Sequence, residues 1–200
     1  GDNTYNEASA SYTINYIEKP YTKYTSFKDI KTDAASDEKV RITLNNAQVV
    51  YANGTNVFVR DASGAICFYN TGLDIKQNDI LNGTLKATYT IFNGMPELTT
   101  CTNIGDITVT SSEEPATAKV ITLNELTANS CDLVTVKGVL VDVTDGTTSI
   151  MDNDLENTAV VYDKFKIAYS AIFNNATIDI TGILFPYEQD ATTIATSFQI

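Results

Sequence analysis

The sequence contains neither histidine nor tryptophan, and it has only three cysteines and four prolines in 200 residues. Without histidine, catalytic triads of the Ser-His-Asp and Cys-His kinds are excluded, and the commonest general base and metal ligand is missing. Cys67, Cys101 and Cys131 show no Cys-x-x-Cys spacing, so they do not form a zinc motif. We interpret them as small buried residues of strands, with a Cys67–Cys101 disulfide as the alternative.

Basic residues are also scarce: 13 lysines and arginines stand against 25 aspartates and glutamates, which gives a net charge of -12. The imbalance is local. Residues 25–110 carry 7 basic and 9 acidic side chains, net -2, whereas residues 119–200 carry 4 and 11, net -7. Nucleic-acid affinity comes largely from phosphate neutralisation, so the second half repels a polyanion and the first tolerates one only weakly. No run of 18 apolar residues is present, so we expect no transmembrane segment.

The most informative pattern that is present is a repeat, at an offset of 91 to 99 residues. Ser26-Phe-Lys-Asp-Ile30 recurs as Thr122-Leu-Asn-Glu-Leu126, and a β-rich run follows each copy. Asn82-Gly83 and the residues after it recur as Thr181-Gly182 and its followers. A duplicated unit of this length has the size of a domain and is too long for a solenoid repeat.

We therefore predict two tandem domains at residues 25–110 and 119–200. A polar, proline-containing linker at residues 111–118 joins them, and residues 1–24 form an N-terminal tether or strand. Within that tether, residues 12–16 alternate apolar and polar side chains as a short strand does.

Strand patterns dominate both predicted domains. The longest are Val40–Tyr51 and Leu133–Val143, and each runs into a hairpin-turn pair, Asn53-Gly54 and Asp145-Gly146. A helical spacing occurs only once at length, over residues 165–172. It predicts a helix between the third and fourth strands of the second domain.

Five strands per unit with a long first strand and a helix after the third match the order of an OB-fold. Asn56-Val-Phe-Val-Arg-Asp61-Ala-Ser-Gly64-Ala-Ile66 resembles the hairpin of strands two and three in OB-type domains of secreted bacterial proteins. Asn93-Gly-Met-Pro-Glu-Leu98, with Gly83 before it, resembles their strand four to strand five region. The chain thus resembles the tandem OB-fold-like domains of secreted Bacteroidetes-type surface lipoproteins. The likeness covers most of residues 25–110 and is fainter over residues 119–200.

This resemblance implies an all-β protein of two tandem five-stranded OB-like β-barrels, with short helices between strands. It also implies an extracytoplasmic protein, secreted or lipid-anchored at the cell surface. Three residues of the motif have a structural interpretation. Asp61 can hydrogen-bond the amides of its own turn, Gly64 suits a positive φ, and Gly83 indicates a bulge that lets the sheet curve.

The ligand face of an OB barrel lies across its second and third strands. Candidate ligand-binding residues at this face of the first domain are Phe58, Arg60, Tyr69, Asn70 and Tyr89. Aromatic rings beside a cation suit stacking on sugars or bases. The alternative for Phe58 and Tyr69 is packing in the barrel or between the domains. Sequence alone does not decide, because a one-residue slip turns a strand's side chains to the opposite face.

Acidic clusters of the second domain are the other candidates: Asp142 with Asp145, and Asp152 with Asp154 and Glu156. Alternating carboxylates suit Ca²⁺, but the second cluster lacks the glycine and distal glutamate of an EF-hand loop, and turn chemistry explains these acids equally well. No two carboxylates are fixed across a groove in the way glycoside hydrolysis requires. We therefore predict no enzyme activity, no catalytic residues, no metal site and no cofactor.

The function predicted from the sequence is a monomeric, non-catalytic binding or adaptor module whose ligand is a glycan or a protein. The alternative is a nucleic-acid-binding OB protein or the accessory part of a secreted nuclease. That alternative requires a positive stripe around Arg41, Arg60 and Lys86. A third interpretation, a structural or assembly subunit, requires a large apolar patch or an uncovered edge strand.

Overall fold

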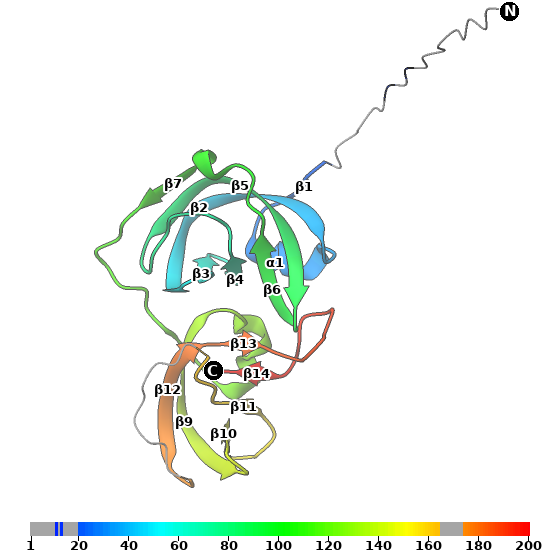
Figure 1. The fold of residues 1–200 in the computed structure, drawn as a ribbon. Helices are drawn as coiled ribbons and strands as arrows, with labels where there is room; N and C mark the ends of the chain where they lie inside the picture. The colour runs from blue at the N-terminus through cyan, green and yellow to red at the C-terminus, as the bar shows by residue number, and fades with distance from the viewer. Residues whose placement is uncertain (1–10, 12, 14–19, 165–173) are drawn as a thin grey trace, which may run out of the picture.

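Two β-barrels stacked one on the other make up the protein in the computed structural model (Figure 1). The structure describes residues 20–164 and 174–200, together with Ser11 and Thr13. Most elements are strands, which confirms the all-β prediction. The strand predicted at residues 12–16 and the helix predicted at residues 165–172 lie outside the described residues.

The first barrel opens with β1 (Thr22–Tyr24) and α1 (Phe27–Asp33). It continues through β2 (Glu38–Asn53), β3 (Asn56–Asp61), β4 (Gly64–Tyr69), β5 (Ile80–Phe92), β6 (Met95–Thr99), the 3₁₀ turn η1 (Ile104–Asp106) and β7 (Ile107–Thr110). Neighbours run β2-β3-β4-β6-β5, and β5 pairs back onto β2, so these five strands close into a barrel. Within it β4 and β6 are parallel and the other pairs antiparallel, which is consistent with the predicted OB-like barrel.

Inward-pointing and outward-pointing side chains alternate along the strands, and the inward-pointing apolar ones fill this barrel. Val40, Ile42 and Leu44 of β2 point into one apolar cluster, while the residues between them face outward. Helix α1 closes one end of the barrel, because Phe27 and Ile30 are both fully buried in the same cluster. The ring of Phe27 meets that of Phe68 edge-on at a centroid distance of 5.9 Å.

All three motif residues do what the sequence predicts, and Gly64 has the expected positive φ, 153°. Asp61 Oδ1 accepts hydrogen bonds from the amides of Ser63 and Gly64 in its own turn, and Oδ2 accepts from the amide of Phe27 at 2.9 Å. The turn and the start of α1 are thereby tied together. At Gly83, where φ is 122°, a Cβ atom would lie 2.2 Å from the carbonyl oxygen of Asp106. Only glycine lets η1 and β7 approach β5 so closely, and β2 shifts register opposite it.

The second barrel repeats the plan. It comprises β8 (Lys119–Ile121), η2 (Leu123–Glu125), η3 (Thr127–Asn129), β9 (Leu133–Thr144), β10 (Thr147–Met151), β11 (Thr158–Val160), β12 (Thr177–Ile183), β13 (Phe185–Pro186) and β14 (Phe198–Gln199). Strand β9 pairs with β8, β10 and β12, and β11 pairs in parallel with β14. This sheet is a curled half-barrel, consistent with a second OB-like unit.

The internal repeat of the sequence corresponds to a repeat of structure. Each barrel starts with a three-residue strand, then a helical turn, then its longest strand, to which the short strand pairs in parallel. The two short strands, β1 and β8, were not predicted. In the part of the chain that the structure describes, no helix has both the length and the apolar character needed to cross a membrane.

Candidate functional site

The second barrel covers the outer face of β3 and β4 of the first (Figure 1). Along β3, Val57 and Val59 point into the barrel, so Phe58 and Arg60 point out. An apolar cluster forms where the barrels meet, and it contains Val50, Phe58, Ala65, Cys67, Met95, Cys131, Ile183 and Phe185. Phe58 is fully buried there, and its ring lies edge-on to that of Phe185 at a centroid distance of 5.2 Å.

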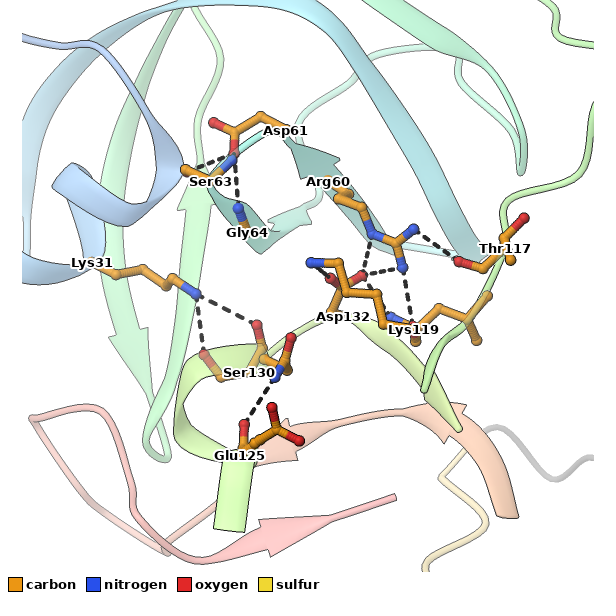
Figure 2. A network of polar contacts seen from close by, with 12 residues as sticks. Lys31, Arg60, Asp61, Ser63, Gly64, Thr117, Lys119, Glu125, Ser130 and Asp132 are labelled. Carbon is orange, nitrogen blue, oxygen red and sulfur yellow. Dashed lines mark hydrogen bonds and ion pairs between the residues drawn. The ribbon is translucent and has the colours of Figure 1, made fainter. Parts of the chain in front are cut away.

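A buried ion-pair network lies beside this cluster (Figure 2). Nε of Arg60 donates to Asp132 Oδ1 at 2.6 Å, and the remaining nitrogens of the guanidinium donate to the carbonyls of Thr117 and Leu133. Asp132 Oδ2 lies 2.7 Å from Nζ of Lys119, so the second oxygen of this carboxylate is also paired with a cation. Every nitrogen of the Arg60 head group is thus bound, Nε and one terminal nitrogen to the second barrel and the other terminal nitrogen to the linker.

Further polar contacts join the barrels on either side of the network. Lys31 of α1 donates to Ser130 Oγ at 3.1 Å (Figure 2). The β5–β6 hairpin of the first barrel is held by the segment of residues 188–195 in the second. There, the amides of Glu188 and Ala195 donate to the carbonyls of Asn93 and Gly94, both at 3.0 Å. The second barrel therefore occupies both the strand face and one border loop where OB-folds hold their ligands.

The structure does not bring the five sequence-predicted ligand residues together. Phe58 and Arg60 lie in the contact between the barrels, so the alternative interpretation of Phe58 is the one observed. Tyr89 is fully buried in the core of the first barrel. Tyr69 and Asn70 are exposed, Tyr69 by 40%, at the end of β4. Ligand binding by these residues stays a prediction.

Titratable groups are also buried between the barrels. Glu97 of β6 is only 4% exposed, and burial raises its pKa to about 7, with Lys164 acting in the opposite direction. Burial also raises the pKa of the Cys131 thiol to about 12. All three cysteines are free, so the Cys67–Cys101 disulfide is not formed. Cys67 is a small buried strand residue as interpreted, but Cys131 is buried in the turn before β9 and Cys101 is half-buried in the loop after β6.

The acidic loop after β10 is explained by turn chemistry. Asp152 accepts hydrogen bonds from the amides of Glu156 and Asn157 and from the side-chain amide of Asn157, and these bonds lower its pKa. Within the described ranges, no three His, Cys, Asp or Glu residues lie close enough to hold a metal ion. Asp152 therefore shapes the loop that carries Glu156.

That loop borders a pocket of about 460 Å³ in the second barrel. The pocket lies between the η2–η3 turns and strands β11 and β14. Its floor is apolar and buried, formed by Leu123, Leu126, Ala159 and Phe198. Its exposed rim is polar, formed by Asn124, Thr127, Glu156, Thr158, Thr196 and Ser197.

Comparison with the first barrel explains why the pocket exists. In the first barrel, Ile66 of β4 faces Val59 of β3 and fills the core beneath α1. The corresponding inward residue of β11 is Ala159, which faces Ile150 of β10. As far as the described residues show, a smaller side chain and two short turns in place of a helix leave the end of the second barrel unfilled. The sequence repeat aligns the two hairpins and so contains this difference in side-chain size, but the pocket was not predicted from it.

No family model matches the chain, and a comparison with curated proteins finds no significant match.

Proposed function

We propose that the protein is a non-catalytic binding module that works outside the cytoplasm, with the first barrel as a platform and the second as the ligand-binding unit. The observation that carries this proposal is the pocket at the end of the second barrel. An apolar floor with a rim of hydroxyl and amide groups is the general design of a small-ligand site. The first barrel has no equivalent pocket, because Ile66 fills the core beneath α1, and its outer face on β3 and β4 is covered by the second barrel.

The chemistry of the pocket favours a neutral sugar. Hydroxyl and amide groups such as those of Asn124 and Thr158 both donate and accept hydrogen bonds, as sugar hydroxyls require. Among the residues that the structure describes, Glu156 is the only charged one at the rim, and residues 119–200 carry a net charge of -7 (4 basic, 11 acidic). An anionic ligand would be repelled there. Leu123 and Phe198 at the floor can take the apolar face of a sugar ring.

The nucleic-acid alternative is less well supported at the expected OB face. It relied on Arg60, but all nitrogens of this guanidinium are bound within the protein. The rings of Phe58 and Tyr89 are fully buried, so neither is available to stack on a base.

The proposal is tested by titrating ¹⁵N-labelled protein with a panel of neutral mono- and oligosaccharides and following the amide shifts. We expect shifts confined to residues around the pocket. Thr158→Trp, which places a ring over the opening from an exposed strand position, should weaken binding at least tenfold. The matched control is Thr108→Trp, an exposed threonine of β7 on the first barrel, which should bind as the wild type does.

Two results would contradict the proposal. One is the absence of shifts with every neutral saccharide. The other is equal binding by the wild type and by Thr158→Trp, which would place the sugar elsewhere on the molecule.

A further inference from the structure

Three cations lie in one row across the first barrel. Lys23 of β1 is the register partner of Arg41 of β2, and Arg41 is the register partner of Lys86 of β5. Their neighbours in sequence, such as Ile42 and Leu85, point into the core, so the three charged side chains share the outer face. Adjacent strands are about 4.8 Å apart, so the row places a cation at each of three successive strands.

This arrangement is unfavourable for the isolated protein. Like charges directly opposite each other on neighbouring strands destabilise a sheet. The chain has 13 basic residues and a net charge of -12, so acidic partners are abundant. Yet among the described residues, none of these three cations has an acidic side chain within ion-pair distance, and the ion pairs seen there belong to Asp132. An anionic ligand would supply a counter-charge to all three cations.

Neighbouring side chains extend the row into a patch. Lys39 lies on the same face of β2, and its Nζ is 5.5 Å from the ring centroid of Tyr21. Nζ of Lys86 is 5.6 Å from the same centroid, and the Tyr21 hydroxyl is hydrogen-bonded to Thr102 at 3.0 Å. The ring therefore serves to position two ammonium groups, and this use leaves it poorly suited to stack on a nucleic-acid base.

Hydroxyl groups lie beside the cations on both sides. Thr88 is the register partner of Lys39, and Thr43 pairs with Thr84 one step beyond Arg41 and Lys86 on the same face. Cations between rows of hydroxyls suit a ligand that carries well-spaced carboxylates among hydrogen-bonding groups. They suit the phosphates of a nucleic acid less, because phosphates are more densely spaced and bring more negative charge close to the acidic remainder of the chain.

We propose that this face of the first barrel, centred on Lys23, Arg41 and Lys86, binds an acidic polysaccharide. It is a second site, on residues of β1, β2 and β5 that take no part in the apolar contact between the barrels. It does not depend on the neutral-sugar pocket, and either proposal can fail while the other stands.

The test measures binding of the full chain to immobilised polygalacturonate by biolayer interferometry at 20 mM and 300 mM NaCl. We expect binding that weakens at the higher salt concentration, and a loss of at least tenfold in Arg41→Gln/Lys86→Gln. The control is Lys137→Gln/Lys76→Gln, which removes the same charge at exposed positions away from the patch and should bind as the wild type does.

Competition assigns the ligand class. Excess soluble polygalacturonate should displace the protein, whereas neutral dextran should not. Stronger binding to a 20-nucleotide oligo(dT) than to polygalacturonate would overturn the proposal in favour of single-stranded nucleic acid. No binding at low salt, or equal loss in both double variants, would overturn it as well.

Discussion

Arg60 and Asp132, 72 residues apart in the sequence, meet with Nε 2.6 Å from Oδ1 of a carboxylate that is 1% exposed. A carboxylate removed from water to this degree is tolerated only with charged and hydrogen-bonding partners around it. Asp132 has them on both sides: Arg60 from the first barrel and Lys119 from the second. The pair therefore makes the stability of each barrel depend on the other.

Asp132→Ala should destabilise the protein by about 3–5 kcal/mol, because it leaves Arg60 and Lys119 without their counter-charge. Arg60→Met/Asp132→Leu should recover most of that loss by replacing the pair with apolar groups. The measurement is urea unfolding followed by circular dichroism and tyrosine fluorescence. Asp154→Ala, at an exposed position, is the control and should change little. A loss no larger than that of the control would show that the network does not join the barrels.

Two glycines at hairpin tips allow the energetic cost of backbone strain to be distinguished from the cost of disturbing the contact between the barrels. Gly54 and Gly94 both have positive φ, 59° and 81°, but only Gly94 touches the other barrel. A Cβ at Gly94 would lie 2.4 Å from that of Ala195, whereas a Cβ at Gly54 meets nothing within 4 Å. Gly54→Ala should cost about 1 kcal/mol, from φ alone. Gly94→Ala should cost about 1–3 kcal/mol more, from the steric clash.

Thermal unfolding of both alanine variants checks this expectation, with limited proteolysis of the 111–118 linker as a second measurement. Faster cleavage is expected in the Gly94 variant alone. Equal melting temperatures would mean that the hairpin contact contributes nothing to the docking of the barrels.

Glu97 should make the protein less stable as pH rises. Its pKa is about 7 in the folded state, against 4.5 for the ordinary group, so the folded state binds more protons between these values. The free energy of unfolding should therefore fall by about 3 kcal/mol as pH rises from 4.5 to 7.

Glu97→Gln should remove that decline and make the variant more stable than the wild type at pH 8. The measurement is a series of urea unfolding curves from pH 4 to 8. Glu113→Gln, an exposed linker residue, serves as the control and should keep the slope of the wild type. An unchanged slope in the Glu97 variant would assign the pH dependence to other groups.

Tyr89→Phe should leave stability unchanged or raise it by about 1 kcal/mol. The Tyr89 hydroxyl is buried and has no hydrogen-bond partner among the described residues, and burial raises its pKa. The variant loses only a desolvated polar group, because the ring stays in the core. Differential scanning calorimetry measures the change. A marked loss of stability would indicate that the hydroxyl has a partner.

Much of the first barrel can be predicted from its sequence, because alternation and turn residues are local signals. The hairpin expected over residues 56–66 is observed as β3 and β4, and the long strand at Val40–Tyr51 extends by two residues at each end. The short strands β1 and β8 escape prediction, since three residues are too few to show a period. Their partners are set by the helical turn that returns the chain beside the long strand.

The candidate site could be predicted only in part, for a different reason. Arg60 and Phe58 do point out of the barrel, as an OB ligand face requires, but no local pattern says that a second barrel covers that face. The place of Tyr89 could not be predicted, because the register of β5 decides which face of the strand its side chain occupies, and in the structure it points into the core. The cation row of Lys23, Arg41 and Lys86 depends on pairing between three strands, and only two of those residues were expected together.

In the first barrel, the face at which an OB-fold normally binds its ligand is covered by the second barrel of the same chain. Freed from the second barrel, the first would expose Phe58, Cys67 and Met95 together with an arginine that has lost its carboxylate. Such a fragment would be prone to self-association, and it would be expected to dimerise or precipitate. The two barrels therefore have to fold and be degraded together, although either looks in isolation like a complete small domain.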